Sequence, residues 1–392
     1  TTGAVVDLAG SKDPRAKELE RRIVLSQYLT AIQCSGSMPP QETGLTCNSW
    51  YGKFHLEMHW WHAAHFALWN RLPMLENSLD WYTKILPSAR DRAKQQGYAG
   101  ARWPKMTSPD GRDSPSPIGP LLIWQQPHPI FYAELAYLNN PTRATLDKYR
   151  MIVDETAKFM ASYAHFAPAS NRYVLGPPVI PAQENHPPRE TWNPTFELEY
   201  WHFGLTTAQK WRARLGLRRD PKWDDIIKRL SPLPTKDGVY LAHENCPQTF
   251  TERNKDHPSM LGALGILTGE MVDRETMLRT LKKVMKEWDW AETWGWDYSM
   301  VAMTAARLGE TAIAIDALLL DTPKNHYLPN GHNYQRENLP LYLPGNGGLL
   351  YAVAIMVNGW KGTPKTAAPG FPSDGSWTVR SEGFHSSLFH EL

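Results

Sequence analysis

The sequence contains few cysteines, and they are scattered. Only Cys34, Cys47 and Cys246 occur among 392 residues, so one disulfide bond at most can form and a disulfide-stapled scaffold is excluded. No CxxC pair is present, which excludes the common cysteine-rich zinc motifs. We therefore expect neither a bound metal ion nor a cofactor.

Long apolar runs are also missing. No stretch reaches the roughly 18 consecutive apolar residues that a membrane-spanning helix needs, and the first residues contain no apolar run typical of a signal peptide. We expect a soluble chain without membrane insertion that is either cytoplasmic or already processed. Because the chain starts abruptly at Thr1, we favour a trimmed extracellular or periplasmic protein.

An excess of charge of one sign is absent as well. The chain has 42 basic and 40 acidic residues, a net charge of +2, and the charges are interspersed, which argues against nucleic acid or an anionic membrane as partner. What the chain has in abundance is aromatic surface, with 17 Trp and 16 Tyr. Such side chains pack against sugar rings and also fill ordinary cores, so a carbohydrate is a favoured ligand.

Helical periodicity dominates the chain. The spacing of apolar residues predicts a first helix over 15–33, a second over 53–70 and a third over 73–95. The second is apolar on nearly every face and should be buried on both sides, whereas the third is one-sided. Further helices are predicted at about 130–138, 143–165, 194–215, 221–229, 258–268, 274–288, 296–308, 311–320 and 347–358. The roughly twelve helices alternate between these two types, which predicts an all-α, six-hairpin (α/α)6 toroid.

We expect residues 1–14 to be a linker and residues 15–392 to form one catalytic domain. Six polar, turn-rich loops should form the rim of its central pocket, since long irregular loops in compact domains are usually functional. These loops are 36–51, 97–128, 176–193, 243–257, 289–297 and 325–346. The residues expected to bind substrate are Trp50, Tyr51, Lys53, His55, Arg102, Trp103, Trp124, His128, Trp192, Trp294, Trp296 and Asp297. Asp297 could instead cap a helix.

Glu184 is the strongest candidate for a proton donor. It lies in PAQENHPPRE, where prolines rigidify the backbone, and partial desolvation there would raise the pKa of its carboxyl group. A surface carboxylate that caps the helix beginning near Pro194 is the alternative. Glu190 and Glu197 are weaker competitors for the role.

Glycoside hydrolysis needs a second carboxylate to activate water or attack the anomeric carbon. The candidates are Glu57, Glu244, Glu292, Asp297 and Glu337. Glu57 lies on the buried second helix, and Glu337 lies in a polar loop that leads into an apolar helix. Spacing alone does not choose between them.

Two further patterns have plain explanations. His55 and His59 stand at i and i+4, but the HExxH pattern of zinc proteases is absent, so hydrogen-bonded or core histidines are the better interpretation. The glycines at 345–348 could hold an anion at a helix start. They lack a P-loop lysine, however, and predict a tight turn into the last long helix.

The order of segments resembles glycoside hydrolase family 95, the inverting α-L-fucosidases and α-L-galactosidases, and more distantly the maltose phosphorylase group. The resemblance runs from about residue 21 to residue 360. It is carried by QYLTAIQCSGSMPPQETGLTCNSW, WYGKFHLEMHWWHAAH, GYAGARWP, IGPLLIWQQPHPIFYAEL, GPPVIPAQEN, DHPSMLGALGI, WGWDYSMVAMTAARLGE and LYLPGNGGLLYAVAIMV. It implies an (α/α)6 catalytic domain and, in family members, an N-terminal β-sandwich that this chain lacks.

The resemblance also implies that Glu184 matches the general acid of the family. The family base depends on two Asn residues and an Asp, and here Lys53, His55 and Pro344 stand at those positions. The fucosidase mechanism therefore does not carry over. We favour Glu337 as the water-activating group, with Glu57 second and Asp297 third.

These observations predict an exo-acting, inverting glycosidase that acts on an oligo- or polysaccharide. Inversion would require acid and base carboxyl groups about 6.5–9.5 Å apart. A toroid-fold polysaccharide lyase or sugar epimerase with a histidine base is the alternative. A catalytically inactive carbohydrate-binding relative is the third hypothesis.

Overall fold

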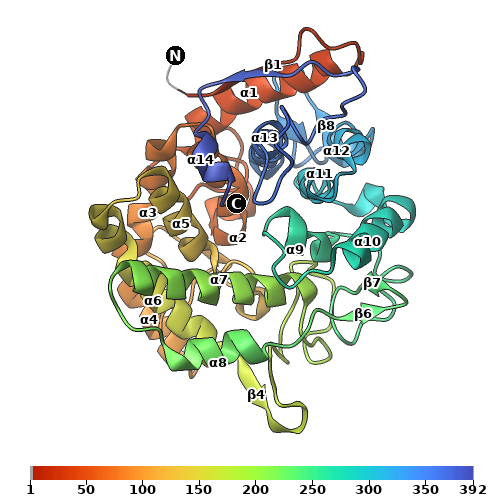
Figure 1. Ribbon diagram of the computed structural model, residues 1–392. Coiled ribbons are helices and arrows are strands. Elements are labelled where there is room, and N and C mark those ends of the chain that lie inside the picture. The colour runs from red at the N-terminus through yellow and green to blue at the C-terminus, as the bar shows by residue number, and fades with distance from the viewer. Residues whose placement is uncertain (1–2, 392) are drawn as a thin grey trace. The chain divides into compact units, whose positions relative to one another are not determined.

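The computed structural model describes residues 3–391, which form helices joined by long loops and short two-stranded ribbons (Figure 1). These residues fall into two compact units. Unit 1 comprises residues 3–78, 264–268 and 289–391, and unit 2 comprises residues 79–263 and 269–288. In the described part of the chain, no helix has both the length and the apolar character needed to cross a bilayer.

Unit 1 is built around helix α13 (Leu343–Asn358), which packs against α1 (Ala16–Cys34), α2 (Leu56–Leu68) and α11 (Asp297–Leu308) (Figure 1). Every residue of α2 is buried, which confirms the prediction of a helix covered on all sides. The remaining elements of unit 1 are β1 (Val5–Asp7), η1 (Trp50–Gly52), β2 (Phe54–His55), η5 (Trp290–Glu292), α12 (Thr311–Leu318), η6 (Pro323–Asn325), β8 (His326–Tyr327), β9 (Asn333–Tyr334), β10 (Arg380–Glu382) and α14 (Ser386–Phe389).

The glycines at 345–348 lie inside α13, which begins at Leu343, so the predicted helix-entry turn is wrong. Their physical role is close helix packing. A Cβ atom on Gly347 would stand 1.8 Å from the carbonyl oxygen of Trp61, and one on Gly348 would stand 3.0 Å from the Trp61 ring. Only glycine lets the backbones of α13 and α2 approach so closely.

Within the segment predicted as a linker, β1 pairs with β10 in antiparallel register, with Val5 opposite Glu382. Val6 of β1 and Leu8, the residue that follows β1, are buried. Residues 4–8 are therefore part of the packed structure of unit 1.

Unit 2 contains a layer in which α5 (His128–Asn139) packs on α6 (Arg143–Tyr163), α6 on α7 (Thr195–Arg214), and α7 on α8 (Pro221–Arg229) (Figure 1). Two of these helices begin at a side-chain cap. At the start of α6 the Thr142 side chain accepts a hydrogen bond from the Thr145 N–H, and at the start of α8 the Asp220 side chain accepts from the Lys222 and Trp223 N–H groups. Its other elements are α4 (Leu86–Gln95), β3 (Met106–Thr107), η2 (Gly119–Leu121), β4 (His165–Ala167), η3 (Pro168–Ser170), β5 (Arg172–Val174), β6 (Thr235–Lys236), β7 (Val239–Tyr240), η4 (Ser259–Leu261) and α10 (Arg274–Glu287).

Two predicted helices are broken in the structure. The helix predicted over 73–95 is two helices, α3 (Leu72–Lys84) and α4, because Pro87 has no N–H to donate to Thr83 and its ring clashes with the preceding turn. The helix predicted over 258–268 is only η4 followed by the four-residue α9 (Gly262–Gly265).

Candidate active site

In unit 1, Glu42, His55 and Glu57 form a buried cluster in which one oxygen or ring nitrogen from each lies within 4.8 Å of the others. Glu57 stands in the first turn of α2, His55 is the residue just before that helix, and Glu42 comes from the loop after α1. We call these three residues the carboxylate–imidazole cluster.

Two more polar groups lie within electrostatic reach of this cluster. The pKa of the Tyr342 phenol lies well above its usual range, first because burial disfavours the phenolate and then because Glu42, Asp297 and Glu57 add negative charge. Asp297 is the first residue of α11, and its carboxylate accepts the backbone N–H of Trp294 at 2.8 Å. Asp297 therefore does not cap α11, whose N-cap is Trp296 and has no side-chain cap; its charge acts on Tyr342 together with those of Glu42 and Glu57.

The residues 50–52, which we call the aromatic turn, have a strained backbone beside this cluster. Trp50, Tyr51 and Gly52 all have positive φ, at 46°, 58° and 70°, a region that costs Trp and Tyr free energy and is often found at functional sites. The indole of Trp50 meets His55 edge-on with ring centroids 5.2 Å apart. Tyr51 is 93% exposed, so the turn presents an aromatic face to solvent.

The three histidines of α2, His59, His62 and His65, are buried. His59 shares a 2.9 Å hydrogen bond with Ser78. Burial lowers the pKa of His62 and of His65 to about 3, and their Nε2 atoms bond to the carbonyl groups of Glu42 and His62 respectively. These contacts agree with the interpretation of the histidines as hydrogen-bonded core residues.

In unit 2, Glu184 lies on the loop before α7 with 28% of its side chain exposed, and its Oε1 is 2.6 Å from the ammonium of Lys105. The backbone N–H of Glu184 donates to the carboxylate of Asp256 at 3.2 Å. The predicted proton donor is thus engaged in an ion pair with Lys105 and held from the backbone side by Asp256.

Two buried carboxyl groups of α7 carry strongly shifted pKa values. Burial raises the pKa of Glu197 to about 8 and that of Glu199 to about 7. Glu197 accepts the N–H of Ala182 at 2.6 Å, and Glu199 accepts the N–H groups of Glu270 and Met271. Glu197 is thus mainly neutral at pH 7 and anchors the backbone two residues before Glu184.

The remaining predicted carboxylates occupy plainer positions. Glu337 is exposed in a turn closed by a bridge of Arg336 with Leu339. Glu244 pairs with Arg172 at 2.6 Å. Glu190 and Glu292 are exposed.

Several of the residues predicted to bind sugar are packed in the core. The buried ones are His55, Trp103, Trp124, His128 and Trp296, whereas Trp50, Lys53, Trp192 and Trp294 are half-buried. The indole N–H of Trp103 donates to Thr156 at 2.9 Å, and His128 bonds the Tyr200 hydroxyl at 2.8 Å. Trp296 stacks on Trp61 with centroids 4.7 Å apart.

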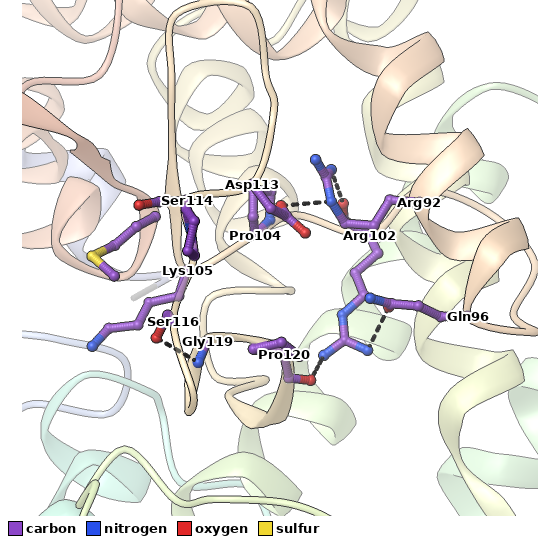
Figure 2. A pocket seen from close by; sticks show the side chains of 12 residues that line it. Arg92, Gln96, Arg102, Pro104, Lys105, Asp113, Ser114, Ser116, Gly119 and Pro120 are labelled. Carbon is purple, nitrogen blue, oxygen red and sulfur yellow. Dashed lines mark hydrogen bonds and ion pairs between the residues drawn. The ribbon is translucent and has the colours of Figure 1, made fainter.

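A pocket of ≈ 250 Å³ in unit 2 is lined by three cationic side chains, Arg92, Arg102 and Lys105 (Figure 2). Arg92 pairs with Asp113 at 2.7 Å. The guanidinium of Arg102 donates to the side-chain oxygen of Gln96 and to the Pro120 carbonyl group, both neutral acceptors. Burial lowers the pKa of Arg102.

Known proteins resemble this chain in structure rather than in sequence. No protein-family model matches it, and no curated protein matches it in sequence. A human-microbiome protein named as a kojibiose phosphorylase aligns with a TM-score of 0.73 over 98% of this chain at 11% identity, and this chain covers 61% of that protein. The fold is the (α/α)6 toroid.

Two other solved structures extend this likeness. A glycosidase variant in complex with glucose has a TM-score of 0.64 at 14% identity, over 86% of this chain and 97% of its own. A GH78 family rhamnosidase of Bacillus sp. GL1 has a TM-score of 0.58 at 10% identity, over 94% of this chain and 37% of its own. The predicted all-α, six-hairpin fold class is confirmed.

Sequence reasoning missed two carboxylates of this toroid, Glu42 and Asp256. Each lies in a loop that was predicted to form the rim of the pocket, so the loop could be singled out from the sequence. The direction of the side chain could not be predicted, because a loop has no periodic pattern of buried residues. Asp256 is the first residue of the segment DHPSMLGALGI and has a left-handed φ of 61°. Such a conformation is uncommon for residues other than glycine, although Asp adopts it more often than most.

Proposed function

We propose that this chain is a carbohydrate-active enzyme that hydrolyses a glycosidic bond. The observation that carries the proposal is the carboxylate–imidazole cluster beside the strained, exposed aromatic turn. Glycoside hydrolysis uses a pair of carboxyl groups, and aromatic side chains offer a flat apolar surface against which a sugar ring can pack. The likeness of the fold to proteins named as glycosidases supports the same conclusion.

We assign the water-activating role to Glu57, ahead of Glu337. Glu57 is fully buried with His55 and Glu42 close by, and such surroundings hold a carboxylate in one orientation. Glu337 is exposed in a turn, where water screens its charge. In the proposed step the attacking water passes its proton to Glu57 as its oxygen bonds to the anomeric carbon.

We assign proton donation to Glu184, as the family resemblance implies. Its proton would pass to the departing glycosidic oxygen as the carbon–oxygen bond breaks. For this, Lys105 must leave the carboxyl group, and a substrate hydroxyl is a suitable new partner for the ammonium. Asp256 positions Glu184 through the hydrogen bond to its backbone N–H.

The test is a panel of aryl glycosides that includes α-L-fucosides and α-L-galactosides, assayed for release of the aryl group and followed by proton NMR. We expect exo-cleavage of one member with an inverted anomeric product. The blank is the double variant Glu57→Gln/Glu184→Gln. Equal release by the double variant, or no release from any member, would overturn the proposal.

A phosphorolytic reaction is the second candidate, and the three cationic side chains of the unit 2 pocket favour it. In that reaction inorganic phosphate attacks in place of water, and the product is a sugar 1-phosphate. Omitting phosphate would then abolish turnover of a disaccharide substrate. Turnover that is independent of phosphate supports hydrolysis.

A further inference from the structure

A second buried cluster of side chains lies in unit 2, outside the residues assigned above. His186, His243 and Cys246 are all buried, and one ring nitrogen or sulfur from each lies within 4.8 Å of the others. The two imidazole rings meet edge-on, with centroids 4.9 Å apart at 83°. We call these residues the His186 cluster.

His186 has an unusual environment for a core histidine. Its side chain is only 4% exposed, and among the residues that the structure describes neither of its ring nitrogens has a hydrogen-bond partner. Buried polar atoms are nearly always satisfied, because an unpaired one forfeits its hydrogen bonds to water. A group that binds a ring nitrogen of His186 would remove this penalty.

The backbone holds the three side chains in place from both sides. The N–H of Cys246 donates to the carbonyl group of His243 at 3.1 Å, a turn that brings both residues to one side. The N–H of Glu244 donates to Trp192 at 2.9 Å, and Arg253 donates to the Asn185 carbonyl group at 2.6 Å. The donor atoms are therefore pre-organised rather than carried on free loops.

We propose that His186, His243 and Cys246 bind a thiophilic transition-metal ion, with Zn²⁺ as the expected metal. Two imidazoles and a thiolate are common zinc ligands, with metal bonds of about 2.0–2.1 Å to nitrogen and 2.3 Å to sulfur. Tetrahedral geometry with these lengths puts the donor atoms about 3.3–3.6 Å apart. A contraction of about 1.2–1.5 Å from the upper limit of 4.8 Å brings the three donor atoms to these separations, and a water molecule can be the fourth ligand.

Two features of the surroundings shape this binding. The positive charge of Arg253 acts on all three side chains, and it opposes the binding of a dication. The Nδ1 atom of His243 accepts the N–H of Asn245 at 3.2 Å. A neutral imidazole has one lone pair, so the metal must displace this long hydrogen bond.

The bound ion would fasten two loops to each other. His186 lies two residues after Glu184, and Cys246 lies on the loop that leads to Asp256. The metal would thereby restrict the motion of both carboxylates without touching the substrate, so its role is to position them.

The experiment uses Co²⁺ as a spectroscopic substitute for Zn²⁺. The full chain is stripped with a chelator under a phosphine reductant and titrated with Co²⁺. We expect one equivalent to bind, with intense visible bands of tetrahedral cobalt and a near-ultraviolet thiolate-to-cobalt charge-transfer band. One equivalent of Zn²⁺ should bleach both bands and raise the Tm of the protein.

Matched variants assign the bands. Cys246→Ser should lose the charge-transfer band, whereas Cys47→Ser, at a half-buried thiol in unit 1, should keep it. If Cys246→Ser does not fold, His186→Asn decides, with His165→Asn at an exposed position as its control. Retention of the charge-transfer band in His186→Asn or Cys246→Ser, or its absence from the stripped wild type, overturns the proposal.

Discussion

Glu57 in unit 1 and Glu184 in unit 2 have opposite surroundings. In unit 1, Glu57 is 0% exposed and has the carboxyl group of Glu42 within 4.8 Å. In unit 2, Glu184 is partly exposed and paired with Lys105, while Glu197 is buried and its pKa is raised to about 8. The difference teaches that burial alone can raise the pKa of a carboxyl group, as at Glu197, whereas Glu184 is engaged in an ion pair with Lys105.

The largest expected effect is at Glu57. Glu57→Gln keeps the shape of the side chain but removes its ability to accept a proton, so kcat should fall about 10²–10⁴-fold on every substrate, the usual value of a positioned acid–base group. Steady-state kinetics with the best aryl glycoside of the panel measure this. Glu337→Gln is the control and should remain active; the opposite pattern would return the role to Glu337.

A selective loss is expected at Glu184. Glu184→Gln removes the proton donor, so kcat/KM should fall about 10²–10⁴-fold for poor leaving groups and much less for dinitrophenyl glycosides, which leave without protonation. Comparing the two leaving groups in one variant makes the measurement internally controlled. Uniform loss across leaving groups, or a matching loss in Glu190→Gln on the same segment, would contradict the assignment.

A stability effect should appear where α13 meets α2. Gly347→Ala places a methyl group against the Trp61 carbonyl oxygen, and overpacking of this kind costs about 1–3 kcal/mol of unfolding free energy, occasionally more. Urea unfolding should show a lower midpoint with an unchanged m-value. Gly36→Ala adds the same methyl group where no atom lies within 4 Å, and a shift of equal size there would refute the packing argument.

The last expected effect concerns the pH dependence of unit 2. In the folded chain Glu197 keeps its proton up to about pH 8, whereas in the unfolded chain it loses the proton near pH 4.5. The unfolded state therefore binds fewer protons in this window, and stability falls as pH rises from 5 to 8. Glu197→Gln should remove this loss, which is at most about 1.4 kcal/mol per pH unit.

Urea unfolding at pH 5 and at pH 8 measures that difference. The carbonyl oxygen of the glutamine can still accept the Ala182 N–H, so the variant tests charge rather than the hydrogen bond. Glu190→Gln, at an exposed carboxylate, should leave the pH slope of the wild type unchanged. Identical slopes in wild type and Glu197→Gln would show that Glu197 ionises normally.

Periodicity predicted the helices well because a helix's buried face repeats along the chain. The first helix, predicted over 15–33, is observed as α1 over Ala16–Cys34. Periodicity failed as a guide where a single residue determines the local backbone conformation. Pro87 divides one predicted helix, and the glycines before Leu349 were interpreted as a turn although close packing on Trp61 needs them inside α13.

The candidate sites were only partly accessible to sequence reasoning for a related reason. Glu57 and His55 could be singled out because they are polar residues on an apolar helix. Glu42 could not, since it lies on a loop whose path is set by the fold. His186 could not be joined to His243 and Cys246, because their spacing matches no metal-binding pattern and only the meeting of two loops unites them.

The interrupted course of unit 1 along the chain has a consequence for synthesis. Unit 2 lies almost wholly within residues 79–288, while unit 1 needs both the first 78 residues and those after 288. A domain emerging from the ribosome can fold once all of its parts are outside. The middle of the polypeptide can therefore fold first. Helices α1 and α2 can pack against α13 only after residues 343–358 have been synthesised.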